Sequence, residues 1–213
     1  MSRLKSTAVC PATLFIDLDG VLRLWPSGYS DLEDAHQLPV GSITRAAFAS
    51  DLLTQVITGR ITDEAWRAEV ARRLAASHPS SRADAAVTAW SKPVGTVSLD
   101  VLNMVMVSRE HCSVGLITNA TDRLPRDLAA LGLTEHLDFV INSSDIGVAK
   151  PSPEIFMHAL AATNTPPQHA VFIDDTASNV AAANAMGIRS HHFVSAASLR
   201  TFMQSVGLPT IAS

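Results

Sequence analysis

Residues 13–20 read TLFIDLDG, a short apolar run that ends abruptly in two aspartates and a glycine. An apolar run of this length is typical of a strand that is buried on both faces. Further strand-length runs follow at residues 113–117, 139–141, 170–173 and 190–194. Segments with helical spacing lie at residues 123–131, 153–162, 177–186 and 197–206. The alternation predicts a three-layer α/β/α fold with a Rossmann-like parallel sheet as its core.

Residues 25–93 interrupt this alternation, because their patterns predict helices alone. The segments with helical spacing in this part of the chain are residues 43–57, 62–75 and 82–90. Ala-rich amphipathic segments of this kind indicate a small helical bundle, inserted after the first strand. We therefore expect an α/β core formed by residues 1–24 and 94–213, with residues 25–93 as a helical cap.

The overall composition excludes several classes of partner. The chain has 213 residues, of which 47% are hydrophobic and 17% charged, and its formal net charge is −4. Its Lys and Arg residues are scattered, so the sequence predicts no nucleic-acid surface. The apolar runs are far shorter than the roughly 20 residues that span a bilayer, and no membrane partner is expected. We expect a cytoplasmic protein, either a monomer or a homodimer.

Polar side chains follow three of the predicted strands at the points where the strands end. These residues are Asp17 and Asp19, then Thr118 and Asn119, and finally Asp174 and Asp175. One such pair could reflect the ordinary preference of aspartate for turns. Parallel strands, however, place their carboxyl ends at one edge of the sheet, where crowded carboxylates require a neutralising cation. Oxygen donors without His or Cys favour a hard divalent ion, and Mg²⁺ suits phosphate chemistry.

Four short motifs together resemble the haloacid dehalogenase-like superfamily. Residues 15–22, FIDLDGVL, match its first motif, and residues 117–119, ITN, resemble the second. Lys150-Pro151 resembles the third motif, and residues 172–175, FIDD, with Asn179 resemble the fourth. The order and spacing agree for all four, from about residue 12 to residue 206. A helical bundle after the first motif is similar to the cap of the sub-class that contains small-metabolite phosphatases, haloacid dehalogenases and hexose-phosphate mutases.

The resemblance implies a role for each of these residues. Asp17 would be the nucleophile that forms an aspartyl-phosphate, Asp19 the general acid and base, and Lys150 the cation beside them. The implied phosphate-binding residues are Thr118, Asn119, Lys150 and Gly20. The implied Mg²⁺ ligands are Asp17, the peptide carbonyl of Asp19, Asp175 and, directly or through a water, Asp174. The connection into the predicted cap supplies three candidate substrate contacts, Trp25, Tyr29 and His36.

The resemblance thus predicts a Mg²⁺-dependent phosphatase acting on a small phosphorylated metabolite, of which a sugar phosphate is one candidate. A hexose-phosphate mutase is the alternative that would need the same motifs. A 2-haloacid dehalogenase is less favoured, because such enzymes resemble this chain but lack an acid at the position of Asp19 and need no metal. A non-catalytic binding protein is least favoured, since every expected catalytic position is filled.

Overall fold

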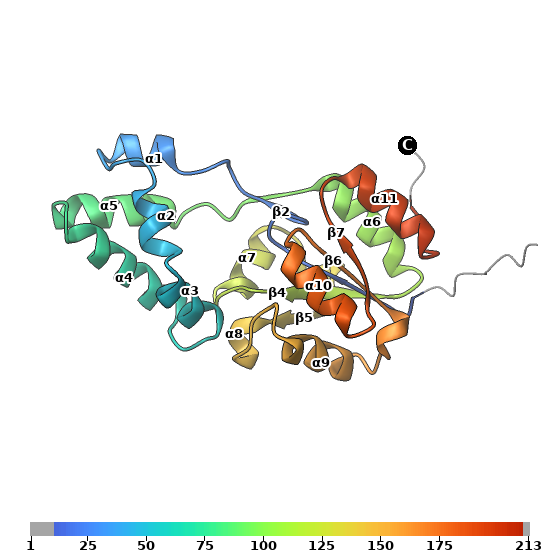
Figure 1. Cartoon of the computed structure of the whole chain (residues 1–213). Helices are drawn as coiled ribbons and strands as arrows, with labels where there is room; N and C mark the ends of the chain where they lie inside the picture. Colours follow the sequence, from blue (N-terminus) through green and yellow to red (C-terminus); the bar gives the residue numbers. More distant parts are fainter. Residues whose placement is uncertain (1–10, 211–213) are drawn as a thin grey trace, which may run out of the picture.

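The computed structural model describes residues 11–210 and shows a parallel five-stranded sheet beside a group of helices (Figure 1). The strands of the sheet are β1 (Thr13–Ile16), β4 (Ser113–Thr118), β5 (Phe139–Asn142), β6 (Ala170–Asp174) and β7 (Arg189–His192). They lie in the order β5-β4-β1-β6-β7, and every neighbouring pair is parallel. The predicted α/β fold with a Rossmann-like sheet is therefore confirmed.

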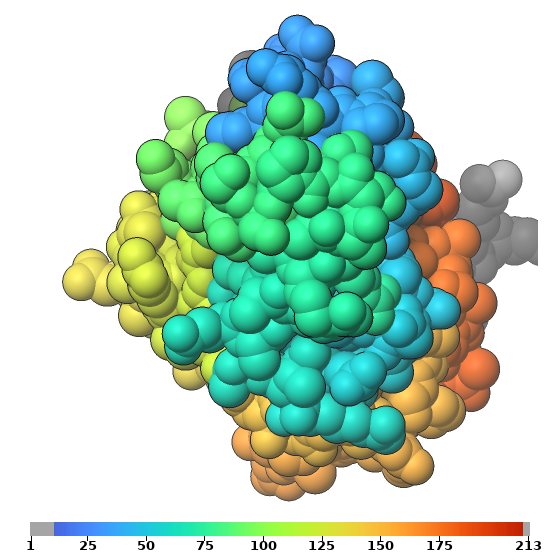
Figure 2. Space-filling view, turned by 90° about the vertical axis from the view of Figure 1, so that its left-hand side faces the viewer, coloured from blue at the N-terminus to red at the C-terminus, as the bar shows by residue number. Residues whose placement is uncertain are grey.

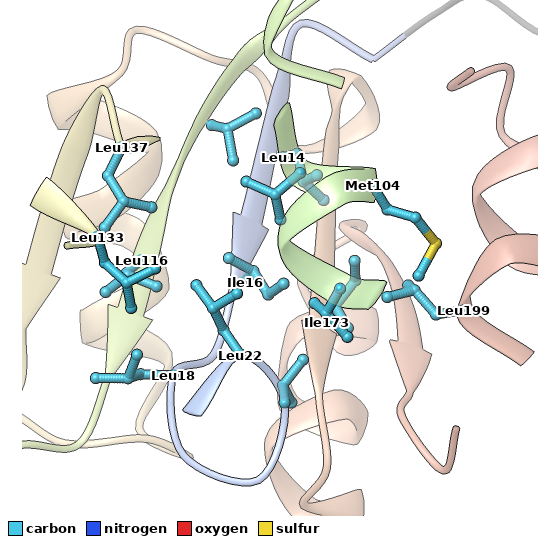
Figure 3. Close-up of a cluster of buried hydrophobic side chains, with 14 of the residues drawn as sticks. Leu14, Ile16, Leu18, Leu22, Met104, Leu116, Leu133, Leu137, Ile173 and Leu199 are labelled. Atoms are coloured by element: carbon cyan, nitrogen blue, oxygen red, sulfur yellow. The ribbon is translucent and has the colours of Figure 1, made fainter. Parts of the chain in front are cut away.

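Helices cover both faces of this sheet. Alternate residues of a strand point to opposite faces, so Leu14 and Ile16 pack on one side and Phe15 on the other. The first face is covered by α6 (Leu99–Arg109), α7 (Leu124–Ala130) and α11 (Ala196–Ser205), as Figure 3 shows for Met104 and Leu199. The second face is covered by α9 (Pro153–Ala162) and α10 (Ala177–Ala185). No helix within residues 11–210 is both long and apolar enough to cross a membrane.

The central strand β1 brings the ends of three strands together. All four of its residues are buried, because strands pair with it on both edges and helices cover both faces. Ile16 is in register with Leu116 of β4 and with Ile173 of β6. The residues that follow these three strands therefore meet at one edge of the sheet, where parallel α/β folds place their ligands.

Five further helices lie between two short strands, β2 (Arg23–Leu24) and β3 (Thr96–Val97), which pair antiparallel. These helices are α1 (Ser30–Ala35), α2 (Ser42–Ala47), α3 (Ser50–Ile57), α4 (Asp63–Ala75) and α5 (Ser80–Trp90), here called the five-helix segment. They enclose a hydrophobic cluster of their own. Figure 2 shows the segment in front of the rest of the chain, which emerges around its edges. The domain boundaries at residues 24/25 and 93/94 stay a prediction.

The five-helix segment contacts the loop that follows β4 and the short helix α8 (Ser143–Ile146), which follows β5. The backbone N–H of Asp63, at the start of α4, donates to Asp122 at 2.7 Å, and the Thr121 hydroxyl lies 3.1 Å from the Asp63 carboxylate. Gly59 packs so closely that a Cβ atom there would lie 2.1 Å from the carbonyl oxygen of Ser144. These contacts place the segment beside the carboxyl ends of the strands.

The helix predicted at residues 43–57 is divided in the structure. The chain leaves the helical conformation at Phe48 and Ala49, between α2 and α3. The turn lets the Phe48 ring lie between Tyr29 and Trp90, at centroid distances of 6.4 and 6.3 Å. Three helices were not predicted, α1, α6 and α8 (Ser143–Ile146). In α6 apolar residues occur all round the helix, including the exposed Leu99 and Met106, so a helical period is hard to recognise.

Candidate active site

Three aspartates form a carboxylate cluster at the ends of β1 and β6. Asp17 directly follows β1, Asp174 is the last residue of β6, and Asp175 follows it. Their ligand oxygens all lie within 4.8 Å of one another. Asp17 and Asp174 are buried, whereas Asp175 is exposed. Two stretches more than 150 residues apart in the sequence therefore meet, because β1 and β6 are neighbours in the sheet.

A buried ammonium group lies inside the carboxylate cluster. The Lys150 Nζ atom is 2.8 Å from Asp17 Oδ1 and 2.6 Å from Asp174 Oδ2. Burying a lysine is costly unless its charge is compensated, and these two carboxylates provide the compensation. The Lys150 backbone is held by the Asn119 side chain, which donates to its carbonyl oxygen at 2.9 Å and accepts from its N–H at 2.8 Å. Asn119 thus positions the lysine, and its predicted contribution to phosphate binding stays a prediction.

The two neighbouring aspartates of β6 have different surroundings. Both carboxylate oxygens of Asp174 accept hydrogen bonds, from the Thr176 N–H at 2.7 Å, from Asn179 Nδ2 at 3.0 and 3.1 Å, and from Lys150. Both oxygens of Asp174 are therefore already engaged by protein donors, one of which is the Lys150 ammonium. Asp175 is exposed, and its carboxylate accepts from the Thr176 hydroxyl at 3.2 Å. Of the pair, Asp175 is the better placed to bind a metal ion directly.

Gly20 allows the loop after β1 to approach Asp175. Its φ angle is +80°, a conformation that side-chain-bearing residues rarely adopt. A Cβ atom at this position would lie 2.0 Å from Asp175 Oδ2, well inside van der Waals contact. A glycine is therefore needed here, since any side chain would displace the Asp175 carboxylate, whereas phosphate binding by Gly20 stays a prediction.

Thr118, the last residue of β4, presents a hydroxyl group without a partner. The residue is 1% exposed, and its Oγ1 atom is buried with no hydrogen-bond partner in the structure. A buried hydroxyl that makes no hydrogen bond costs about 1–3 kcal/mol of stability. A ligand oxygen at the end of β4 would remove this cost, as the predicted phosphate contact requires.

The donor set of the carboxylate cluster fits a hard divalent cation. Every candidate ligand atom is a carboxylate oxygen, and the three negative charges are opposed within the cluster by one lysine. Oxygen-only donors with a remaining negative charge suit Mg²⁺, which keeps several waters and binds through few carboxylates. Asp17 and Asp175 would hold the ion, with Asp174 close behind them.

Asp19 lies apart from the cluster, in an ion pair with Arg23. The Arg23 guanidinium donates to both Asp19 oxygens, at 2.6 and 2.9 Å, and the Trp25 indole N–H donates to Oδ1 at 2.6 Å. The Asp19 side chain is 39% exposed, whereas that of Arg23 is 5% exposed. The predicted acid/base residue is thus oriented by two neighbours and remains accessible to solvent.

The partners of Asp19 were missed by sequence reasoning. Arg23 also donates to Asp127 at 3.1 Å, and Asp127 in turn accepts from Arg123 at 2.8 Å. Arg123 donates further to the carbonyl oxygen of Ser91, which follows α5. A weak signal was present, because Arg23 is the one charged residue in the otherwise apolar stretch from Val21 to Leu24. Its partners on α7 could not be found without the tertiary structure.

A cavity of about 590 Å³ opens beside Asp19, and two of the three candidate substrate contacts line it. Trp25 and Tyr29 line it, whereas His36 does not. The reason lies in α1, whose six residues separate Tyr29 from His36 and carry the chain roughly 9 Å along the helix axis. His36 is therefore not among the residues that line this cavity, and the roles of Trp25 and Tyr29 as substrate contacts stay a prediction.

A family model described as haloacid dehalogenase-like hydrolase matches residues 11–187 of the chain. The chain belongs to this family. The match covers the four motifs and the whole carboxylate cluster, and it confirms the resemblance of the motifs. Whether this haloacid dehalogenase-like (HAD) hydrolase belongs to the capped sub-class stays a prediction.

Similar proteins differ in their chemistry. The chain is 28% identical to the mouse protein "Bifunctional epoxide hydrolase 2" over 192 residues, which cover 81% of this chain and 34% of that protein. It thus spans about a third of the length of that relative. A HAD family enzyme from Bacteroides thetaiotaomicron, crystallised with magnesium and inorganic phosphate, is similar in fold (TM-score 0.68, 21% identity, 85% of this chain and 93% of that one). So is a 2-haloacid dehalogenase from Pseudomonas syringae (TM-score 0.60, 22% identity, 84% and 85%).

Burial raises the pKa of the Asp17 carboxyl group in this HAD-like hydrolase to about 7, from 3.8. Lys150 opposes the shift, and the charges of Asp174 and Asp19 add to it. Because the folded pKa exceeds the unfolded one, the native state binds more protons between these two values. The contribution of Asp17 to stability therefore falls as pH rises through this window and stays low above it.

Asp17→Asn should accordingly raise the melting temperature of the metal-free HAD-like hydrolase at pH 8. Asparagine removes the buried charge, and its oxygen can still accept from the Leu18 N–H and from Lys150, the two partners of Asp17 Oδ1. Calorimetry of both proteins in the presence of a chelator measures the difference, which should shrink towards pH 4. A variant that melts below the wild type at pH 8 would contradict the expectation.

Proposed function

We propose that this HAD-like hydrolase is a Mg²⁺-dependent phosphomonoesterase that forms an aspartyl-phosphate on Asp17. The observation that carries the proposal is the carboxylate cluster, in which Asp17, Asp174 and Asp175 meet within 4.8 Å around a buried lysine. Phosphoryl transfer depends mainly on positioning and on neutralising charge. A cluster that combines a carboxylate nucleophile, an ammonium group and a site for a divalent cation supplies both.

In the first step Asp17 attacks the phosphorus atom, and the bond from phosphorus to the leaving-group oxygen breaks. The Lys150 ammonium, 2.8 Å from Asp17 Oδ1, aligns this carboxylate and favours its ionised form against the effect of burial. The unpartnered hydroxyl of Thr118 donates to an oxygen of the transferred phosphoryl group. Asp19 in its protonated form gives its proton to the departing alkoxide. When bound, Mg²⁺ would neutralise part of the phosphoryl charge at the carboxylate cluster.

In the second step a water molecule hydrolyses the aspartyl-phosphate, and Asp19 accepts the proton of that water. The ion pair with Arg23 suits the ionised form of Asp19, which is the form that this step needs. For the first step the carboxyl group must exchange the guanidinium for the leaving-group oxygen. Its 39% exposure leaves room for that exchange. The five-helix segment would act as a cap that shapes the space for the leaving group.

The same residues would serve a hexose-phosphate mutase, which transfers the phosphoryl group to a second sugar hydroxyl instead of water. A dehalogenase is less favoured, since a halide leaves without a proton and gives no role to Asp19. A mutase would produce an isomeric sugar phosphate and a dehalogenase would release halide, whereas a phosphatase releases inorganic phosphate. Analysis of the products therefore distinguishes the three functions.

Phosphate release from a panel of small phosphomonoesters, measured with Mg²⁺ and with EDTA, tests the proposal. We expect release with Mg²⁺, its loss in EDTA because the carboxylate cluster has then lost its neutralising cation, and its recovery when excess Mg²⁺ is restored. Isomerisation of a sugar phosphate without phosphate release would identify a mutase. Halide release from a 2-haloacid in the presence of EDTA, without any phosphate release, would overturn the proposal in favour of a dehalogenase.

A further inference from the structure

The cavity beside Asp19 has an aromatic wall. It is lined from the five-helix segment and from the connection that leads into it by Trp25, Tyr29, Phe48, Trp66 and Trp90. It is also lined by residues of the loop after β4 and of α7, among them Thr121 and Asp127. Its volume of about 590 Å³ is within the usual range for sites that bind small molecules.

The rings of this wall hold one another in place. The Trp66 and Trp90 centroids are 5.1 Å apart in an edge-to-face arrangement, and Tyr29 stacks on Phe48 at 6.4 Å. Trp66 and Trp90 are buried, but Trp25 and Phe48 are 40% and 41% exposed. Rings of this exposure offer apolar surface that a ligand would remove from water, which favours an apolar ligand by the hydrophobic effect.

Of the charged residues that line the cavity, all except the exposed Asp31 are paired with one another. Arg23 pairs with Asp19 and Asp127, and Arg123 pairs with Asp127 as well. Arg67 pairs with Asp63 and also lies over the Trp90 ring, 5.0 Å from its centroid. All three arginines of the lining are thus compensated by carboxylates. A second anionic group on a ligand would have to displace one of these pairs.

Asp19 connects the cavity to the chemistry. It lines the cavity and accepts the Trp25 indole N–H at 2.6 Å, so the aromatic wall begins at the acid/base residue itself. The residue that protonates a leaving group must contact that group. The part of the substrate beyond the scissile oxygen would therefore lie in this cavity, against the aromatic wall.

We propose that the cavity takes the leaving group of the substrate, and that this group is apolar, either an aromatic ring system or an alkyl chain. The proposal rests on the phosphatase function proposed above and narrows its substrate class. It moves the expected substrate away from sugar phosphates, because the exposed ring surface of Trp25 and Phe48 favours an apolar group and the three arginines of the lining are already paired. The phosphate end of the ester would remain at the carboxylate cluster.

Binding can be measured without turnover, because all three tryptophans of the chain line this cavity. Octylphosphonate and naphthylmethylphosphonate represent the alkyl and aromatic forms of the ligand, and methylphosphonate is the matched probe without an apolar group. Their carbon–phosphorus bonds resist phosphatase cleavage. With Mg²⁺ present, we expect at least one of the two larger probes to bind at least tenfold more tightly than methylphosphonate, through burial of its apolar surface. Calorimetry measures the affinities, and a saturable change in tryptophan fluorescence with octylphosphonate reports binding at the cavity.

Phe48→Gln and Met157→Gln form a matched pair of variants. Both replace an exposed apolar side chain, 41% and 52% exposed respectively, but Phe48 lines the cavity whereas Met157 lies on α9. We expect Phe48→Gln to weaken the preferred larger probe at least threefold while methylphosphonate binding is unchanged. Met157→Gln should bind all probes as the wild type does. Equal loss in both variants, or no loss in Phe48→Gln, would overturn the assignment of the leaving group to this cavity.

The failure of this proposal can be distinguished from the failure of the phosphatase proposal. If the larger phosphonates bind selectively but no ester releases phosphate, the cavity assignment stands and the phosphatase proposal fails. If naphthyl phosphate, octyl phosphate and a hexose phosphate release phosphate with equal kcat/KM, the phosphatase proposal stands and the apolar leaving group is wrong. A preference for one of the two apolar esters decides between a ring system and a chain.

Discussion

Replacing Asp17 by asparagine is expected to lower kcat for phosphate release by about 10⁴-fold or more, the scale on which a nucleophile acts within a concerted set of groups. The amide has no charge with which to attack phosphorus, so no aspartyl-phosphate forms. The surroundings of the side chain are kept, since its oxygen can still accept from the Leu18 N–H and from Lys150. Phosphate release and the amount of phosphoenzyme in acid-quenched samples measure the effect.

Asp84→Asn is a suitable control for Asp17→Asn. It makes the same change of one atom and one charge on the exposed surface of α5, and it should leave kcat unchanged. The metal-free Asp17→Asn protein should also be at least as stable as the wild type, so that loss of activity cannot be ascribed to unfolding. Wild-type kcat in a folded Asp17→Asn protein would remove Asp17 from the chemistry.

Replacing Asp19 by asparagine should have an effect that depends on the leaving group. An alkyl phosphate needs a proton on its departing oxygen, and removal of a general acid typically costs about 10²–10⁴-fold in rate. We therefore expect kcat/KM for an alkyl phosphate to fall by about that factor. For 4-nitrophenyl phosphate, whose leaving group is stable as an anion, kcat/KM should fall far less. Steady-state kinetics with the two esters measures the difference.

The second half of the reaction gives an independent signature of the same variant. Without a base to take the proton of the attacking water, the aspartyl-phosphate of Asp19→Asn should accumulate, and 4-nitrophenol should appear in a burst before a slow steady state. Asp127→Asn is the control, because it breaks the other ion pair of Arg23, 3.1 Å long, and leaves Asp19 intact. An equal fall for both esters, without a burst, would mean that Asp19 is a structural partner of Arg23 only.

Much of the fold followed from patterns that are local in sequence. The strands at residues 13–16 and 170–173 are short apolar runs that end in aspartates, and the structure has them as β1 and β6 with bounds that differ by at most one residue. The carboxyl ends of the predicted strands were expected to meet at one edge of the sheet, and the structure shows that these two strands are direct neighbours. The single predicted helix at residues 43–57 was wrong, because at the turn Phe48 packs against Tyr29, which precedes α1, and Trp90, which ends α5.

The candidate site was predictable to a similar degree. The residues named from the four motifs lie together in the carboxylate cluster and beside it, apart from Asp19, which faces the cavity in an ion pair with Arg23. The role of the Asn119 side chain was not predictable, because it forms hydrogen bonds with the backbone of a lysine 31 residues further along the chain. The pairs of Arg23 with Asp127 and of Asp127 with Arg123 were missed for the same reason, since α7 meets the loop after β1 only in the folded protein.

The sequence by itself determined the parallel α/β core, the family and the acids that gather at the strand ends, because periodicity, strand-end chemistry and motif spacing are all local properties. Only the tertiary structure decided which partner holds each acid and what kind of space the leaving group would enter. The sequence alone does not indicate that the five aromatic residues from Trp25 to Trp90 form one surface. They form one wall beside Asp19 because helix packing, which depends on contacts between distant segments, brings them together.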